Sequence, residues 1–363
     1  MSRLLFATGG SGGHIYPALA VAELARSRGY EVHLIGQSGG MEERLSAEAG
    51  VPFIGVASGK LDRQRPDPTA LLRSLAGVRS AVAAIRRLRP ALVLGFGGFA
   101  SFPGTAAAVL TRTPLLLHEQ NAYPGLVTRL LAPFARVLVL SQPALTKRTR
   151  ARRVEIIPYP VRERRVERSE ARRLLGLPAE GTLTLVMGGS QGSAALNDAV
   201  VAALEELRDV RPLVLHSTGP VHLEKVRAAA AGVTNYVARP YVDAVEAWSA
   251  ADLAITRAGF GTLSEAAYFG VPLITVPLPT AAENHQLHNA RAFADAGAGR
   301  VLEQRELAEL PKVWREMLHD STRLAAATAA GALSPRGAAT RFVELIDELN
   351  ETPGASGAVQ ETR

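Results

Sequence analysis

The sequence predicts an α/β fold of two doubly wound, parallel-sheet domains of the Rossmann type that face a cleft. The first observation is a succession of apolar strand, glycine-rich turn and helix that occurs once in each half, from residues 4–8 into 9–14 and from 183–187 into 188–192. The second is that apolar strands alternate with helical stretches along the whole chain, which indicates parallel sheets covered by helices on both faces. Ligands of such sheets bind beyond the carboxyl ends of the strands, where these turns lie.

Each glycine-rich turn predicts a phosphate site. A turn that leads from a strand into a helix brings backbone N–H groups and the positive end of the helix dipole up to an anion. Two such turns in one chain therefore predict two nucleotide-fold halves that share one ligand.

The individual strands are predicted from short apolar runs bounded by glycine, proline or polar residues. Helices are expected in the gaps between them, for example at residues 17–28, 194–207 and 262–269. The expected strands are residues 4–8, 31–35, 91–95, 115–118 and 137–140 in the first half, and 183–187, 212–217, 235–238, 253–256 and 273–276 in the second.

The chain is long enough for two domains, because its 363 residues have the composition of a globular protein, 47% hydrophobic and 21% charged. We expect domains at residues 1–160 and 161–350, joined near 150–165, with the last helix free to pack back on the first domain, and a flexible tail at 351–363. The absence of cysteine excludes disulfides, thiolate zinc sites and a cysteine nucleophile. No apolar run reaches the length of a signal peptide or a membrane span, so we expect a cytoplasmic location.

The net charge of +7 comes almost entirely from arginine, since only four of the 41 basic residues are lysine. Most of this excess is typical of a GC-rich coding sequence, and we expect no nucleic-acid partner. A predicted helix around residues 71–89 nevertheless carries five arginines beside six apolar residues. This helix suits an anionic membrane surface, and it equally suits an ordinary amphipathic helix packed on a sheet. Both interpretations stay open here.

The glycine turns do not match the common nucleotide-binding motifs. A dinucleotide fingerprint that starts at Gly10 would need glycine where Ile15 stands, and the acidic residue expected after the second strand is replaced by Gly36 and Gln37. A P-loop needs a lysine, and no lysine lies near any glycine turn. The sequence therefore argues against NAD and against P-loop hydrolysis of ATP or GTP.

Three further polar or glycine-rich segments follow predicted strands, at residues 95–101, 118–121 and 256–265. Together with the two glycine turns they make five such segments at the expected ligand edges. The segments read GGSGGHIYPALAVAEL, GFGGFASFPG, HEQNAYPG, GGSQGSAALN and TRAGFGTLSEAAYFGVP. In this order they resemble the signature blocks of the MurG family of peptidoglycan glycosyltransferases, and the similarity runs from residue 4 to about residue 345.

The resemblance implies a GT-B fold and an inverting transfer of N-acetylglucosamine from UDP-N-acetylglucosamine (UDP-GlcNAc) to lipid I, which forms lipid II. It implies no cofactor. It places the lipid acceptor on the N-terminal domain and the donor mostly on the C-terminal domain. It further implies a peripheral protein at the cytoplasmic face of the plasma membrane, on an anionic surface and in reach of other cell-wall synthesis proteins.

The family's binding residues carry over to matching positions. Ser190 with the amides of Gln191 and Gly192 would hold the diphosphate, and Glu265 would accept hydrogen bonds from the ribose hydroxyls. Val242 and residues 260–262 would line the uracil and phosphate side. The implied donor residues are Ser11, Gly12, Gly13, Asn121, Arg162, Ser190, Gln191, Gly192, Val242, Phe260, Gly261, Thr262, Leu263, Ser264, Glu265, Gln286 and Asn289, of which Gln286 and Asn289 would read sugar hydroxyls; the implied acceptor residues are Gly97, Gly98, Phe99 and Ser101.

The transfer needs a base for the acceptor hydroxyl and a way to stabilise the departing UDP. His14 is the first candidate base, because histidine titrates near working pH and this one lies on a glycine turn. Its alternatives are a phosphate ligand or a helix-capping residue. Glu119 is the second candidate, with a structural role in its loop as the alternative. No Asp-x-Asp motif occurs, so we predict no metal site and assign the leaving-group charge to backbone dipoles and Arg162.

The chain departs from the family pattern near Arg162 and in the acceptor loop. Residues 158–162 read Pro-Tyr-Pro-Val-Arg where the family commonly has Gly-Asn-Pro-Val-Arg. Phe99 replaces a common tyrosine and Phe102 a common glycine. The contact of Arg162 and the details of acceptor binding are the features that these changes affect.

Three rival functions differ in a measurable way. Another GT-B transferase, such as a diacylglycerol glycosyltransferase, would share the donor half but not both GGSGGH and HEQN. A UDP-GlcNAc 2-epimerase would convert the nucleotide sugar without any acceptor. A non-enzymatic nucleotide-sugar-binding module would show no acceptor-dependent release of UDP.

Overall fold

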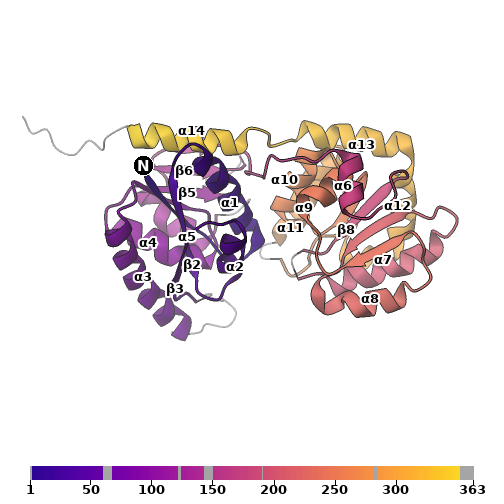
Figure 1. The fold of residues 1–363 in the computed structure, drawn as a ribbon, viewed down its shortest axis with the longest axis horizontal. Helices are drawn as coiled ribbons and strands as arrows, with labels where there is room; N and C mark the ends of the chain where they lie inside the picture. The colour runs from indigo at the N-terminus through magenta and orange to yellow at the C-terminus, as the bar shows by residue number, and fades with distance from the viewer. Residues whose placement is uncertain are drawn as a thin grey trace, which may run out of the picture. The chain divides into compact units, whose positions relative to one another are not determined.

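The computed structural model describes residues 2–59, 68–121, 124–142, 150–189, 191–281 and 284–351. The chain divides into two compact units, the first formed by Met1–Arg162 with Gly337–Arg363 and the second by Glu163–Arg336 (Figure 1). Each unit holds one parallel sheet between layers of helices, so the predicted fold class is confirmed.

The sheet of the first unit has seven parallel strands in the order β3-β2-β1-β4-β5-β6-β7. The strand order reverses between β1 and β4, where Ala7 pairs with Gly95. The strands are β1 (Arg3–Ala7), β2 (Glu31–Gln37), β3 (Phe53–Val56), β4 (Leu92–Gly95), β5 (Leu115–Glu119), β6 (Val137–Leu140) and β7 (Val154–Ile156); the helices are α1 (Gly12–Ser27), α2 (Met41–Glu48), α3 (Pro68–Leu88), α4 (Phe102–Leu110), α5 (Leu126–Leu131) and α14 (Ala338–Glu351), with short 3-10 helices η1 (Phe99–Ser101) and η2 (Ala132–Phe134).

Both faces of this sheet are buried, because successive residues of a strand point to opposite sides. Leu4 and Phe6 pack in one core with Phe342 from α14. Leu5 and Ala7 pack in another core on the opposite face. Burial on both faces explains why the central strands are continuous apolar runs.

The sheet of the second unit has six parallel strands in the order β10-β9-β8-β11-β12-β13, and its strand order reverses between β8 and β11. The strands are β8 (Leu183–Met187), β9 (Leu213–Ser217), β10 (Tyr236–Arg239), β11 (Leu253–Thr256), β12 (Leu273–Thr275) and β13 (Gly299–Val301); the helices are α6 (Arg168–Leu174), α7 (Ala194–Glu206), α8 (Leu223–Ala229), α9 (Ala244–Ala250), α10 (Phe260–Phe269), α11 (His285–Asp295), α12 (Leu310–Leu318) and α13 (Asp320–Ala332), with 3-10 helices η4 (Pro220–His222) and η6 (Gln304–Glu309).

All ten predicted strands are present, with ends shifted by at most two residues. Three further strands escaped prediction, and all three lie at sheet edges: β3, β7 and β13. These edge strands are short and only partly buried, so they lack the continuous apolar run of a central strand.

The predicted helix at residues 17–28 begins too late, because α1 starts at Gly12. Glycine is a poor helix former, which hid the first turn from sequence analysis. Pro17 lies inside the helix and has no N–H to donate to the carbonyl of Gly13, four residues earlier. That carbonyl must find other donors.

The chain crosses between the units twice, at Arg162–Glu163 and again at Arg336–Gly337. After the second crossing, α14 packs on the first unit, where Figure 1 shows it in yellow. The Phe342 ring is fully buried there, 5.9 Å from the Phe96 ring and 5.4 Å from the His118 ring.

We expect Phe342→Ala to lower the free energy of unfolding of the first unit by about 3–5 kcal/mol, because it leaves a cavity among buried rings. Urea unfolding followed by circular dichroism measures this. Leu324→Ala is the control, since that leucine of α13 is 60% exposed and its loss should cost under about 0.5 kcal/mol. Equal effects of the two substitutions would contradict the packing of α14 on the first unit.

Candidate functional site

The reversal of strand order in the first unit brings three predicted segments to one sheet edge. The first turn of α1, which follows β1, carries His14, the turn after β4 carries Gly97, and Gln120 follows β5. Because β1, β4 and β5 are neighbours, their carboxyl ends lie side by side. Sheets of this type bind ligands at such a point.

The His14 ring lies against the backbone that follows β4. Its Nδ1 is 2.9 Å from the carbonyl oxygen of Phe96 and 2.8 Å from Nε2 of Gln120. Gly97 and Gly98 have φ of +84° and +79°, and a Cβ at Gly97 would come within 2.8 Å of Nδ1. Two of the four predicted acceptor residues, Gly97 and Gly98, are therefore glycines because their conformation and the nearby histidine ring require it.

The carbonyl of Gly13, which Pro17 leaves without a helical partner, receives two side-chain donors. Gln120 Nε2 donates to it at 3.2 Å and the Tyr159 hydroxyl at 3.0 Å. Tyr159 is buried and is the residue that replaces the family's asparagine. The departure from the family pattern thus attaches the segment before Arg162 to the glycine turn.

The Glu119 carboxylate is buried and accepts four hydrogen bonds from its own loop. Oε1 accepts from the backbone and side-chain nitrogens of Asn121, each at 3.0 Å. Oε2 accepts from the Gly125 amide at 2.8 Å and the Thr128 hydroxyl at 2.9 Å. This geometry supports the loop-holding alternative for Glu119, and it also orients Asn121.

His118 lies under the site with its ring buried among Phe96, Tyr159 and Phe342. Its Nε2 is 2.9 Å from the Ser141 hydroxyl. Burial, with a smaller contribution from the charge of His14, lowers the pKa of His118 to about 3. His118 is therefore neutral wherever the protein works.

The remaining predicted residues of the first unit differ in how accessible they are to a ligand. Ser11 is an exposed N-cap of α1, so the amides of Gly12 and Gly13 that follow it have no partner within the helix. The Phe99 ring lies against Gly10, whereas Ser101 is buried and donates to the Gly98 carbonyl.

Arg162 lies away from the glycine turn. It is exposed, and its Nε is 3.9 Å from Glu23, in the fourth turn of α1. The structure therefore does not place its guanidinium beside Gly12 and Gly13.

In the second unit, the glycine turn after β8 lies beside the segment after β11. Gly192 has φ of +74°, and a Cβ there would come within 2.0 Å of the Thr218 carbonyl oxygen. Its amide donates to the Gly189 carbonyl at 3.0 Å and so closes the turn, and its contact with a phosphate stays a prediction. Gln191 is exposed, and Ser190 lies outside the described residues.

The first turn of α10 provides the amides of Gly261 and Thr262, which have no partner within the helix. One turn later, Glu265 Oε2 accepts from Nε1 of the buried Trp248 at 3.0 Å. Two other predicted residues of this helix, Leu263 and Ser264, have side chains that point inward. Leu263 is in the core, and the Ser264 hydroxyl donates to the Phe260 carbonyl.

Three further predicted residues help to build this edge. Gln286 Oε1 accepts from the amides of Ala258 at 3.2 Å and Leu278 at 3.0 Å. Asn289 is buried and donates to the Ala258 carbonyl at 3.4 Å, and Val242 packs against the core. Gln286 and Asn289 therefore support the loop that follows β11.

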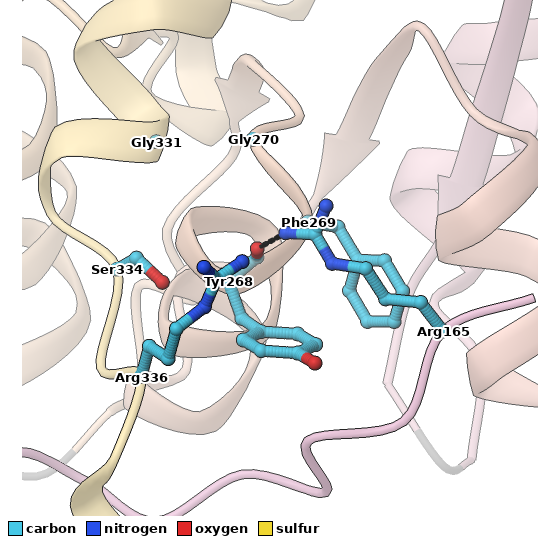
Figure 2. Close-up of a pocket in the computed structure, with 7 residues that line it drawn as sticks. All are labelled: Arg165, Tyr268, Phe269, Gly270, Gly331, Ser334 and Arg336. Carbon is cyan, nitrogen blue, oxygen red and sulfur yellow. Dashed lines mark hydrogen bonds between the residues drawn. The ribbon is translucent and has the colours of Figure 1, made fainter.

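A cavity of about 380 Å³ lies elsewhere in the second unit, at the carboxyl-terminal ends of α10 and α13 (Figure 2). Arg165 donates to the Tyr268 carbonyl, and its guanidinium lies 4.7 Å from the centre of the Tyr268 ring. Figure 2 shows Arg336 approaching Tyr268 from the opposite side. Helix carboxyl ends carry negative partial charge, so Arg165, which donates to the Tyr268 carbonyl in the last turn of α10, stabilises that helix end.

Among the described residues, no group of three or more His, Asp or Glu side chains is arranged to hold a metal ion. Within the same part of the chain, no helix combines the length and the apolar character needed to cross a bilayer.

The comparisons with known proteins match both halves of the chain. Residues 4–139 match the model of the glycosyltransferase family 28 N-terminal domain, and residues 183–348 match that of the family's C-terminal domain. The chain belongs to glycosyltransferase family 28. Together the two matches cover most of both sheets.

Relatives that are similar over nearly their full length carry the name UDP-N-acetylglucosamine--N-acetylmuramyl-(pentapeptide) pyrophosphoryl-undecaprenol N-acetylglucosamine transferase. The relative from Deinococcus deserti is 45% identical, with 96% of this chain and 99% of the relative covered. The relative from Thermus thermophilus is 44% identical, with 95% and 99% covered.

Solved structures agree in fold. The crystal structure of Acinetobacter baumannii MurG has a TM-score of 0.73 at 29% identity, over 96% of this chain and 100% of that one. A putative UDP-N-acetylglucosamine 2-epimerase from Listeria monocytogenes has a TM-score of 0.70 at 15% identity, over 97% of each chain, which shows a shared fold only.

Sequence analysis missed three residues that build the site: Gln120, Tyr159 and Trp248. Gln120 lies in the segment HEQNAYPG, directly after a predicted strand. Its polar side chain at the expected ligand edge was therefore a usable signal for a site residue. Tyr159 was marked only as a departure from the family pattern, since its partner Gly13 lies far away along the chain, and nothing local marks Trp248.

We expect the buried His118 to make the first unit less stable in acid. The pKa of His118 is about 3 in the folded protein and 6.5 in the unfolded chain, so the unfolded state binds more protons between these values. The free energy of unfolding should therefore fall by about 1.4 kcal/mol for each pH unit below 6.5 from this group.

Urea titrations at pH 7.0, 5.5 and 4.5 measure this slope, and His118→Phe should remove the contribution while it keeps the ring packing. Ser141→Ala is the matched control, because it removes the Nε2 partner but leaves the titrating group and hence the slope. An unchanged slope in His118→Phe would contradict the prediction.

Proposed function

We propose that this protein transfers N-acetylglucosamine from UDP-GlcNAc to the 4-hydroxyl of lipid I, with inversion at the anomeric carbon, and so forms lipid II for peptidoglycan. The observation that carries this proposal is the match over nearly the full length to relatives that bear the name of this activity. The glycine turns at the strand-order reversal of each sheet support it, since they are suited to phosphate groups.

The first unit would bind the lipid acceptor and the second the donor. In the second unit, the amides of Gly261 and Thr262 at the start of α10 are suited to the diphosphate. The Trp248 indole holds Glu265 in one orientation, which suits a carboxylate that accepts from the two ribose hydroxyls. Ser190 and Gln191, on the turn after β8, would contact the same diphosphate.

The chemistry would use His14 as the general base. His14 Nε2 would take the proton of the acceptor 4-hydroxyl while this oxygen forms a bond to C1 of the donor sugar. The bond from C1 to the UDP oxygen breaks on the opposite face, and the amides at the helix N-termini stabilise the charge that develops on UDP. Asn121, oriented by Glu119, would approach the donor sugar with the Ser11–Gly13 turn.

We also propose that the first unit binds the anionic cytoplasmic face of the plasma membrane. On α3, Val78 and Ile85 are buried, whereas Leu72 and Leu75 are 66% and 52% exposed. The helical spacing places Arg79 on the same exposed face as these leucines. Further exposed apolar side chains lie on α4, α5 and η2: Leu110, Leu126, Leu130 and Phe134. Contacts with other cell-wall synthesis proteins stay a prediction.

The transfer is tested by incubating the protein with radiolabelled UDP-GlcNAc, with and without a short-chain lipid I analogue. We expect labelled lipid and free UDP only when the acceptor is present. His14→Ala should lower kcat by about 100-fold to 10,000-fold, because a general base contributes that much. The control is His33→Ala, since His33 pairs with Glu31 near the start of β2 and should leave kcat unchanged. Conversion of the donor without acceptor would favour an epimerase instead.

Membrane binding is tested by co-sedimentation with vesicles of phosphatidylglycerol and phosphatidylcholine. We expect Leu72→Ser with Leu75→Ser to weaken binding at least about tenfold, because two leucines lose their burial in the acyl region. Leu324→Ser is the control, since it removes a similarly exposed leucine from the second unit. Equal binding by both variants, or binding that ignores the anionic lipid fraction, would contradict the proposal.

A further inference from the structure

Two neighbours make opposite demands on the Nδ1 atom of His14. The Phe96 carbonyl, 2.9 Å away, can only accept a hydrogen bond, so it favours a proton on Nδ1. The Gln120 amide nitrogen, 2.8 Å away, donates, so it favours a bare Nδ1. A ring nitrogen has one in-plane position, which holds either a proton or a lone pair. Only one neighbour can therefore be satisfied at a time.

The orientation of the Gln120 amide is set by a second contact. Its Nε2 also donates to the Gly13 carbonyl at 3.2 Å, and that carbonyl is open because Pro17 has no N–H. A reversed amide would point Oε1 at this carbonyl oxygen, and two acceptors repel. In the observed orientation Oε1 is buried without a hydrogen-bond partner among the described residues. Within the described part of the chain, one buried acceptor is thus left unsatisfied while the amide faces both Gly13 and His14.

We propose that Gln120 is a positioning residue for His14, and that its amide and the Phe96 carbonyl compete for Nδ1 and so set which ring nitrogen carries the proton. This inference rests on the proposed function, in which Nε2 takes the proton of the acceptor hydroxyl. When the proton is on Nδ1, Nε2 has its lone pair and can act as the base. When Nδ1 accepts from Gln120, the proton is on Nε2 and the base is blocked.

The same contact discourages the imidazolium form. A doubly protonated His14 carries a proton on Nδ1, which would then meet the N–H of Gln120, and two donors facing each other repel. Gln120 therefore keeps His14 neutral to a lower pH than the Phe96 carbonyl alone would allow. The neutral form favoured in this way carries its proton on Nε2, so Gln120 lowers the titration midpoint of His14 without adding productive base at acid pH.

The other titratable groups around the turn are held by their own partners. His118 from β5 is buried and neutral, with a pKa of about 3. Glu119 accepts four hydrogen bonds from its loop, and Glu42 from α2 accepts from the amides of Gly10 and Gln37. Tyr159 donates to the Gly13 carbonyl, on the same side as Gln120.

Nuclear magnetic resonance of the full-length protein with labelled histidine tests the proposal without any substrate. The His14 signals are assigned by their loss in His14→Gln, and nitrogen chemical shifts report which ring nitrogen is protonated. We expect Gln120→Met to move the proton toward Nδ1 and to raise the titration midpoint of His14 by about half a pH unit or more. Gln120→Glu should raise it by about one unit or more, since a carboxylate accepts from Nδ1–H.

Tyr159→Phe is the matched control. It removes the other donor to the Gly13 carbonyl and keeps both the Gln120 amide and the Phe96 carbonyl beside Nδ1, so the tautomer and the midpoint of His14 should stay as in the wild type. A Gln120 side chain that only supports the turn would make Gln120→Met resemble Tyr159→Phe, and this result would overturn the proposal. The two Gln120 variants are independent, so one that folds, by its circular dichroism, is enough.

Kinetics separate this inference from the proposed function. The acid limb of kcat/KM should move to higher pH in Gln120→Met by the same amount as the midpoint measured by resonance. A His14 midpoint that moves in Gln120→Met while His14→Ala retains full transfer would support the pairing and reject His14 as the base. A midpoint that does not move in either Gln120 variant rejects the pairing, whatever the activity.

Discussion

The parallel pairing of β1 with β4 is the constraint on which the site of the first unit depends. Strands far apart in the sequence become neighbours, with Ala7 opposite Gly95, and the turns that follow them meet at one edge. The backbones approach so closely that a Cβ at Gly98 would lie 2.0 Å from the Gly9 carbonyl oxygen. The glycines at this edge are therefore required by the strand pairing, before any ligand is considered.

The arrangement of the polar side chains at this edge follows from the hydrogen bonds that the backbone needs. Pro17 frees the Gly13 carbonyl, and buried carbonyls need donors. Gln120 and Tyr159 supply them, and Gln120 is thereby brought to the ring of His14. A proline in a helix thus determines the surroundings of the proposed base. Tyr159, at which this chain departs from its family, thus supplies one of the two donors to the Gly13 carbonyl.

The second unit repeats the sheet plan with a different use of its helix ends. The amino end of α10 lies at the ligand edge, where the amides of Gly261 and Thr262 have no partner within the helix, and Trp248 holds Glu265 one turn later. Its carboxyl end is neutralised by Arg165, next to the point where the chain crosses between the units. One helix therefore presents a site suited to anions at one end and a cationic contact beside a cavity at the other. This opposition follows from the direction of the helix dipole.

The sequence by itself determined the fold class, every central strand, the five ligand-edge segments and the family, because buried parallel strands and glycine turns leave strong local patterns. Only the tertiary structure revealed the edge strands β3, β7 and β13, whose half-exposed residues lack such a pattern. It also decided that Gly192 closes its own turn, that Arg162 lies beside Glu23, and that Gln120 and Tyr159 share one carbonyl. Each of these contacts joins a side chain or amide to a partner chosen by three-dimensional packing, and no local sequence pattern encodes that choice.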